Sequence, residues 1–237
     1  MRSLLAGQSR GWQIEPMSAP PFILTPELML RAYRIGLFPM AEAREDKELH
    51  WLDPDRRGIL PLHGFHMPRS LMKTLRSGRF TVTANTAFEH VIQNCAKIRQ
   101  SEPGTWINHE IERLFIALHR LGFAHSVETW QNGELVGGLY GAALGGAFFG
   151  ESMFSTATDA SKVALVHLVA RLRLGGYKLL DTQFITSHLA RFGTVEIDRT
   201  TYHDLLDVAV ESPAKFIVCP DPAALLSEIE AMKREMP

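Results

Sequence analysis

Two apolar stretches separated by a helical pattern decide the fold of this chain: residues 147–154, AFFGESMF, and residues 177–184, YKLLDTQF. Both have the length and composition of buried strands, yet they carry Glu151, Asp181 and Gln183, polar groups that buried strands normally avoid. Because strand side chains alternate between faces, we expect Asp181 and Gln183 on one face. Their desolvation is costly unless they have a partner or a function, so chemistry is expected here. The alternative is a pair that only satisfies backbone groups at the strand end.

The neighbouring segments extend these two strands into a sheet. Two earlier strands are expected at 124–130 and 134–143, joined to each other and to the strand at 147–154 by turns at 131–133 and 145–146. A helix over 159–174, ended by two glycines, leads to the strand at 177–184.

Further elements are expected on either side of this block. The pattern predicts a strand at 80–83 and a helix at 69–77. A second helix is expected from a Thr86/Glu89 capping box to about residue 99, and a third after Asn108 as its cap. Two more helices are expected near 202–210 and after Pro222.

The order of helices, antiparallel meander and strand–helix–strand predicts an α+β fold. It is the order found in GNAT-like acyltransferases, with a mixed, mostly antiparallel sheet flanked by helices, and we assign it to residues 65–237. Residues 1–64 are rich in proline and are assigned to a small N-terminal domain with one clear helix, capped by Thr25 with Pro26 in its first turn. The segment 155–161 lacks the glycines with which GNAT folds bind acyl-CoA and places Asp159 at a helix start, which disfavours acyl-CoA.

Composition limits the functional classes. The 237-residue chain is 46% hydrophobic and 22% charged, as in ordinary globular proteins, and no apolar run reaches the ~20 residues of a membrane span. The first residues lack a secretory signal pattern, and two distant cysteines fit reduced thiols, so we expect a cytoplasmic protein. The ten histidines show no ligand spacing, and no metal site is expected.

Charge is balanced overall but not locally. The net charge of −1 excludes a globally basic nucleic-acid binder, whereas residues 56–88 contain no Asp or Glu. Such a segment is either a phosphate-facing surface or a solvated face that happens to lack acids. Its cations are Arg56, Arg57, Arg69, Lys73, Arg76 and Arg79.

Several linked motifs make the chain resemble a known family. In order along the chain they are GLFP at 36–39, WLDPDRR at 51–57, GTWI at 104–107, LVGGLYG at 135–141, GESMFS at 150–155 and LDTQ at 180–183. The chain resembles the leucyl/phenylalanyl-tRNA–protein transferases of the bacterial N-end rule pathway, over roughly residues 22–207.

The resemblance implies transfer of Leu or Phe from aminoacyl-tRNA to the α-amine of proteins that begin with Arg or Lys. An aminoacyl ester is already activated, so no cofactor is expected, and an α-amine with a pKa near 8 is partly free at neutral pH. Positioning amine and ester together supplies on the order of 7–11 kcal/mol in favourable cases. The expected partners are the charged tRNA and the acceptor protein, and a monomer is expected.

The resemblance also implies roles for individual residues. Asp181 and Gln183 are expected at the reacting amine, where Gln183 accepts a hydrogen bond and Asp181 holds or polarises it. Glu151 is expected to bind the α-ammonium of the transferred residue, with a buried ion-pair member as the alternative.

The remaining site residues follow from the same resemblance. An apolar pocket for Leu or Phe falls to Leu139, Met153 and Leu180, which as single residues could be plain core. Trp51 and Trp106 are expected to stack on the terminal adenosine, with a packed anchor as the alternative for Trp106. The basic residues of 56–79 would meet acceptor-stem phosphates. Ser152 and Thr186 complete the expected substrate contacts, although Thr186 and Ser187 depart from the Asn-Asp of the family.

Three other functions are compatible with the sequence. One is a GNAT-like enzyme that uses acyl-CoA to modify a small amine, against which the missing phosphate loop counts. Another is a non-catalytic module that binds tRNA or peptide. The last is a Fem-like transferase that builds peptidoglycan bridges on a cell-wall amine.

Overall fold

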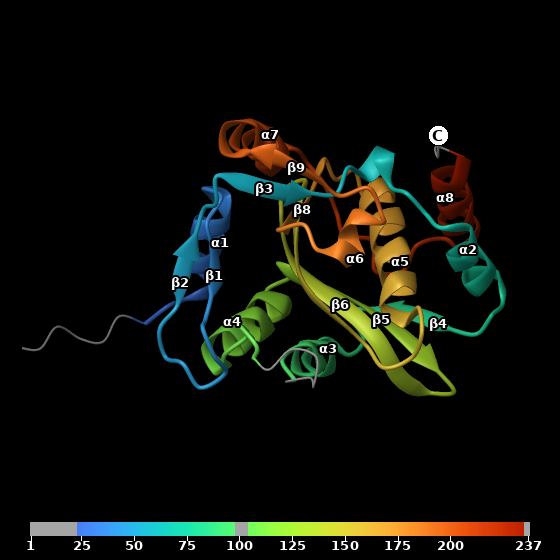
Figure 1. Ribbon diagram of the computed structural model, residues 1–237, viewed down its shortest axis with the longest axis horizontal. Coiled ribbons are helices and arrows are strands. Elements are labelled where there is room, and N and C mark those ends of the chain that lie inside the picture. The colour runs from blue at the N-terminus through green and yellow to red at the C-terminus, as the bar shows by residue number, and fades with distance from the viewer. Residues whose placement is uncertain (1–22, 98–103, 235–237) are drawn as a thin grey trace, which may run out of the picture.

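A computed structural model describes residues 23–97 and 104–234 of the chain. It contains two sheets with helices packed around them (Figure 1). The first 22 residues, the predicted end of the helix near residue 99, and the last three residues lie outside the described part.

The N-terminal segment is more regular than its prolines suggest. Helix α1 (Pro26–Arg34) begins as predicted, because the Thr25 hydroxyl accepts a hydrogen bond from the Leu28 amide at 3.3 Å and Pro26 needs no such partner. Two short strands that the sequence did not predict, β1 (Phe38–Met40) and β2 (His50–Leu52), then form a separate antiparallel hairpin. A third, β3 (Arg56–Ile59), leaves this segment and joins the large sheet.

The large sheet has seven strands in the order β4-β5-β6-β7-β8-β3-β9. All neighbours are antiparallel except β7 and β8, which makes the sheet mixed and mostly antiparallel, as expected. The strands besides β3 are β4 (Thr81–Ala84), β5 (Ala124–Gln131), β6 (Glu134–Leu144), β7 (Ala147–Ser155), β8 (Leu179–Gln183) and β9 (Val195–Asp198). The sequence had predicted all of these but β9 to within two residues. The predicted turn at 131–133 is present, with Asn132 and Gly133 both at positive φ.

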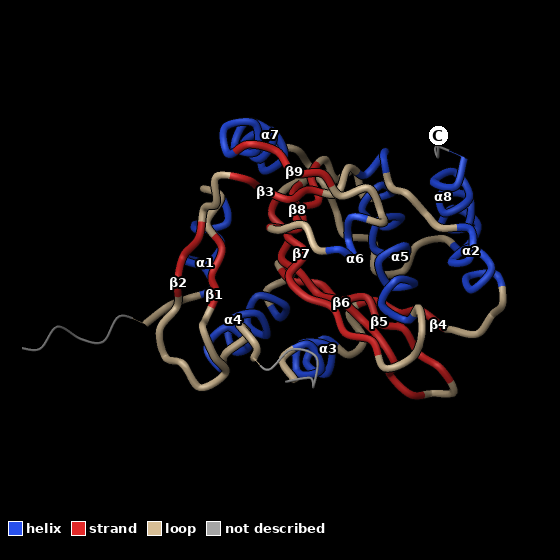
Figure 2. Tube along the Cα trace, viewed as in Figure 1, coloured by secondary structure: helices blue, strands red, loops and turns tan. Residues whose placement is uncertain are grey.

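Helices cover both faces of the sheet (Figure 2). One face carries α5 (Ala160–Leu174), which is itself covered by α2 (Arg69–Arg76) and α8 (Pro222–Arg234). The other face carries α3 (Phe88–Cys95) and α4 (His109–Arg120), and α7 (Arg199–Glu211) packs near β3, β8 and β9. A 3-10 turn, Leu62–Gly64, and a one-turn helix, α6 (Ser187–Ala190), complete the elements. Because it is enclosed on two sides, α5 is apolar around most of its circumference.

One predicted start of a helix is wrong. The Thr86 hydroxyl donates to the Ala84 carbonyl instead of capping, and α3 begins at Phe88 without a side-chain cap. The carboxylate of buried Glu128 accepts from the Ala87 amide at 3.4 Å and so replaces the expected capping box. The Asn108 cap of α4 is confirmed, with its side chain accepting from the Ile111 amide at 2.8 Å.

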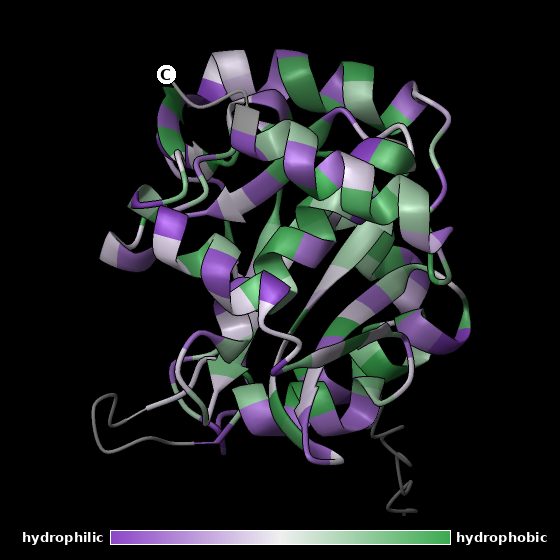
Figure 3. Ribbon diagram, turned by 90° about the vertical axis from the view of Figure 1, so that its right-hand side faces the viewer, coloured by the Kyte–Doolittle hydropathy of each residue, from purple (hydrophilic) through white to green (hydrophobic). Residues whose placement is uncertain are grey.

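Two apolar clusters fill the spaces on either side of the sheet, one beneath α3 and α4 and the other around α5. Figure 3 shows apolar colouring along the strands inside the molecule and mixed colouring on the outer helices. None of the helices in the described residues is long and apolar enough to cross a membrane.

Candidate active site

The site lies where the parallel strands β7 and β8 separate. Paired residues of β7 and β8 end at Phe149 and Asp181. Beyond that point β7 continues beside β6, whereas β8 turns away beside β3. A cavity of about 560 Å³ occupies the opening, between Gly150–Ser155 on one side and Thr182–Leu189 on the other, with α5 residues beneath it.

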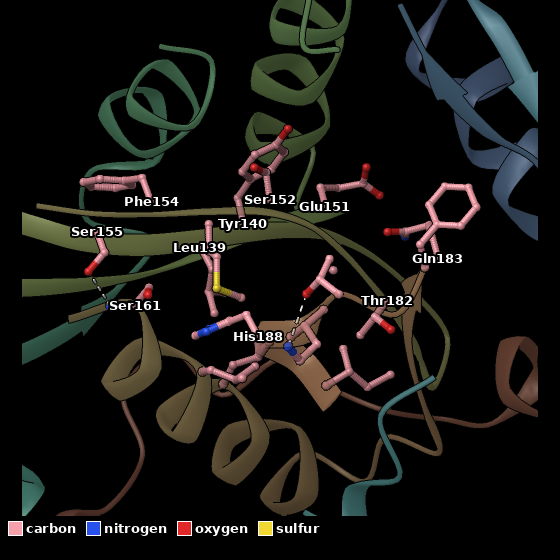
Figure 4. A pocket seen from close by; sticks show the side chains of 18 of the residues that line it. Leu139, Tyr140, Glu151, Ser152, Phe154, Ser155, Ser161, Thr182, Gln183 and His188 are labelled. Carbon is pink, nitrogen blue, oxygen red and sulfur yellow. Dashed lines mark hydrogen bonds between the residues drawn. The ribbon is translucent and has the colours of Figure 1, made fainter. Parts of the chain in front are cut away.

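The cavity has a polar end and an apolar region. In Figure 4 the Glu151 carboxylate and the Gln183 amide point toward one another at the same end, while Leu139 and His188 lie further along. Met153, Leu180, Ser152 and Thr186 line the same cavity, as does Trp106 from the loop before α4. The structure therefore brings together most of the substrate-binding residues expected from the sequence. Trp51 is not among the residues that line this cavity; it lines a separate cavity of about 650 Å³.

Glu151 is held by a residue of the N-terminal helix. The hydroxyl of fully buried Tyr33 donates to its carboxylate at 2.7 Å, and Tyr33 packs on Phe149 with ring centroids 4.7 Å apart. Burial raises the pKa of Glu151 to about 8; the Asp181 charge adds to the rise, and the Tyr33 hydrogen bond and Arg57 oppose it. A carboxyl with this pKa is ready to ionise when a cation replaces the water around it.

Asp181 does not line the cavity. Its carboxylate is fully buried and forms an ion pair with Arg57, Nη2 to Oδ2 at 2.7 Å, and it accepts from the Tyr202 hydroxyl at 2.8 Å. The expectation that Asp181 and Gln183 share a face is wrong. The reason is that Gln183 has φ +55°, so the alternation of the strand stops before it and its side chain turns into the cavity.

Arg57 does not belong to the tRNA-contacting surface predicted from the sequence. Its guanidinium is 1% exposed and bound to Asp181, so it cannot reach a phosphate, and this prediction is wrong. The other five cations are exposed. Arg56 lies on β3 and pairs with Glu196, whereas Arg69, Lys73, Arg76 and Arg79 lie on or just after α2. Figure 1 shows β3 and α2 on different sides of the molecule, with α5 and α6 between them.

Several polar atoms in the cavity have no partner. Four of them are buried without a hydrogen bond: the side-chain amide nitrogen of Gln183, the hydroxyls of Thr182 and Tyr140, and Nε2 of His188. Burial, followed by the charges of Lys162 and Arg191, lowers the pKa of His188, so its imidazole is neutral at pH 7. Unpaired buried groups are costly, and their gathering here is typical of a site that is complete only with a bound molecule.

Sequence reasoning missed the residues that support this site. Tyr33 reads as the apolar face of a helix, and Tyr202 and His188 stand alone in their segments. The start of α5, where acyl-CoA phosphates bind in GNAT folds, is occupied: the Asp159 carboxylate pairs with Lys162 at 2.6 Å, and the Ser155 hydroxyl accepts from the Ser161 amide. In the described residues no three His, Cys, Asp or Glu side chains gather as a metal site would require.

Comparison with known proteins shows the family. The family described as leucyl/phenylalanyl-tRNA protein transferase matches residues 59–207, and the N-terminal domain of that family matches residues 23–55. A leucyl/phenylalanyl-tRNA–protein transferase of Paramagnetospirillum magneticum is 61% identical over 193 residues, 81% of this chain and 92% of its own length. One from Rhodospirillum rubrum is 56% identical over 204 residues, 86% of this chain and 96% of its own.

Among solved structures, the L-PGS of Bacillus licheniformis is similar over 69% of this chain and 55% of its own, with 15% identity. Its TM-score of 0.38 is too low to support an argument. The sequence matches establish the class of the protein, an aminoacyltransferase. More narrowly, the chain belongs to the leucyl/phenylalanyl-tRNA protein transferase family.

Proposed function

We propose that this protein transfers Leu or Phe from aminoacyl-tRNA to the α-amine of proteins that begin with Arg or Lys, which marks them for N-end rule degradation in the cytoplasm. The observation that carries this proposal is the single cavity that combines an ionisable carboxyl, Glu151, and a free amide, Gln183, with an apolar region that includes Leu139. An aminoacyl ester presents three features complementary to these: an ammonium, a carbonyl and an apolar side chain.

In the proposed reaction the acceptor amine attacks the ester carbonyl carbon. A C–N bond forms, the bond from that carbon to the tRNA ribose oxygen breaks, and the proton lost by the amine balances the one that the ribose oxygen gains. Ionised Glu151 holds the α-ammonium of the donor residue, and the Gln183 carbonyl accepts a hydrogen bond from the attacking amine. Because a glutamine is a weak base, placement of the two substrates supplies most of the acceleration.

The apolar region selects the transferred side chain. Leu139 and Leu180 are 3% and 2% exposed, and Met153 provides an adaptable wall. We propose that β-branched residues are rejected there, at a cost of only about 1–3 kcal/mol for one misplaced methyl group. Trp106, Ser152 and Thr186 contact the remainder of the aminoacyl-adenosine. The tRNA phosphates contact a surface of exposed cations, Arg69, Lys73, Arg76 and Arg79. Trp51, in contrast, is partly buried in the β1–β2 hairpin and packs against the apolar core.

The proposal includes a monomer with a two-part organisation. Residues 1–64 form the small N-terminal domain and residues 65–237 the catalytic domain, although β3 of the first part completes the sheet of the second. The separation of β7 from β8, with a helix below the opening, supports a GNAT-like arrangement for the catalytic domain.

One experiment tests the reaction. The protein is incubated with Leu-, Phe- or Ile-tRNA and with peptides that begin with Arg, Lys, Glu or Ala. We expect transfer from the first two tRNAs to the first two peptides only. In Gln183→Ala we expect kcat to fall at least about 100-fold, whereas Gln93→Ala, on the exposed side of α3, leaves it unchanged. Binding of aminoacyl-tRNA without transfer would instead indicate a non-catalytic module, and stabilisation by coenzyme A an acyl-CoA enzyme.

A further inference from the structure

Two buried residues next to the cavity have no part in the reaction as proposed. Arg57 of β3 and Tyr202 of α7 are both fully buried, and neither lines the cavity. We propose that Arg57 and Tyr202 are positioning residues that act through Asp181 to hold Gln183 in its catalytic orientation. This inference rests on the proposed function, because it explains what holds the side-chain amide of Gln183 in place to meet the acceptor amine.

The Arg57 guanidinium is fixed on every side. Its Nε donates to Asp181 at 3.0 Å, its Nη1 to the Gly36 carbonyl at 2.9 Å, and its Nη2 to both Asp181 and the Tyr202 hydroxyl. The rings of Phe38 and Tyr202 lie over it, with centroids 4.5 and 4.3 Å from its central carbon. A planar, bidentate group that stacks flat against a ring is a property of arginine that lysine does not share.

The Asp181 carboxylate has no capacity left for a substrate. Oδ1 accepts from Arg57 Nε and, at 2.8 Å, from the backbone N–H of Gln183. Oδ2 accepts from Arg57 Nη2 and from the Tyr202 hydroxyl. An ionised carboxylate offers about four acceptor positions, and all four are used. Asp181 therefore acts on the reaction through the backbone of Gln183 and not by contact with the amine.

The backbone at Gln183 needs this support. Its φ of +55° is a conformation that side-chain-bearing residues rarely adopt, and the Phe184 amide closes a tight turn onto the Thr182 carbonyl at 2.6 Å. The opposite strand contributes Gly58, where an added Cβ would lie 2.8 Å from the Phe184 backbone. The hydrogen bond from the backbone N–H of Gln183 to Asp181 thus fixes the turn that directs the Gln183 side chain into the cavity. Without this bond the strand could continue and point Gln183 elsewhere.

The test uses Tyr202→Phe, which removes one hydroxyl and keeps the ring over Arg57. We expect kcat for Leu transfer to an Arg-starting peptide to fall about 10-fold, with both KM values within twofold, when measured well below the unfolding midpoint, which the loss of this buried hydroxyl lowers. Tyr177→Phe is the matched control, because this buried ring packs on Phe148 outside the network, and it should leave kcat unchanged. Arg57→Lys should reduce kcat further despite keeping the charge.

A double-mutant cycle separates positioning through Asp181 from independent effects. In an Asp181→Asn background, Tyr202→Phe should cost less than a further twofold in kcat. A full 10-fold loss there, or a Tyr202→Phe enzyme with kcat within twofold of the parent, would overturn the proposal.

A measurement without substrate keeps this inference separate from the proposed function. Hydrogen exchange of the Gln183 amide should become about 10-fold faster in Tyr202→Phe and stay unchanged in Tyr177→Phe. Unchanged exchange in both variants would refute the positioning role even if the parent protein is fully active. A parent protein that transfers nothing, with the expected change in exchange, would refute the function and leave the network in place.

Discussion

The replacement Glu151→Gln should make this protein more stable at alkaline pH while it disables transfer. In the folded protein the pKa of Glu151 is raised from its ordinary 4.5 to about 8, chiefly by burial. Between these two values the unfolded chain has lost this proton and the folded protein still binds it. Stability therefore falls as the pH rises through this window, and the full loss is present above pH 8.

The size of the effect follows from the shift. At about 1.4 kcal/mol for each pH unit, the change from 4.5 to about 8 corresponds to at most about 5 kcal/mol. As a residue Glu151 is only half-buried, so solvent screens its charge in part, and we expect on the order of 2 to 5 kcal/mol. A glutamine is neutral throughout, and it retains an acceptor for the Tyr33 hydroxyl.

Urea unfolding of both proteins at pH 5, 6, 7 and 8 measures this difference, with Leu transfer at pH 7 as the functional readout. The free energy of unfolding of the variant should exceed that of the parent by an amount that grows with pH. Glu134→Gln, at an exposed position of the β5–β6 turn, serves as the control and should show no such growth. Parallel stability curves for Glu151→Gln and the parent would refute the reasoning.

Two further predictions concern the support of the site and of the sheet. In Tyr33→Phe the hydrogen bond that lowers the pKa of Glu151 is lost, so the rise of kcat/KM with pH should move upward by about one pH unit; an unmoved profile would show that ionised Glu151 does not hold the donor. Gly141→Ala should lower the free energy of unfolding by on the order of 3 kcal/mol, because its Cβ would lie 2.2 Å from the Phe149 carbonyl oxygen in the adjacent strand. Gly104→Ala, where a Cβ meets nothing within 4 Å, should change it little by the same urea assay.

Local signals in the sequence were sufficient for most elements. Thr25 with Pro26, and Asn108, marked the starts of two helices, and Asn132-Gly133 marked a hairpin, because each of these residues acts on its immediate neighbours. The strands β5 to β8 followed from apolar composition and turn spacing. The sequence also pointed to Glu151 and Gln183 as polar side chains in apolar strands, and both line one cavity.

What the sequence did not reveal depends on contacts between distant segments. Arg57 stands among cations that reach the surface, whereas its own side chain is held inside by partners distant in sequence, among them Asp181, 124 residues away. The departure of Gln183 from strand geometry depends on the same carboxylate. Strand β9 was missed because its residues are mostly exposed, and it exists by pairing with β3. These features require the folded arrangement and have no signature in a local window.

Three hydrogen bonds at the site join residues far apart in the chain, with separations of 118 for Tyr33 and Glu151, 124 for Arg57 and Asp181, and 145 for Arg57 and Tyr202. A polypeptide emerging from the ribosome therefore carries an unfinished network until α7 has been synthesised and has folded. A product of interrupted translation that contains Arg57 but ends before Tyr202 lacks this partner and leaves the Arg57 charge to be buried with incomplete compensation, which destabilises such fragments.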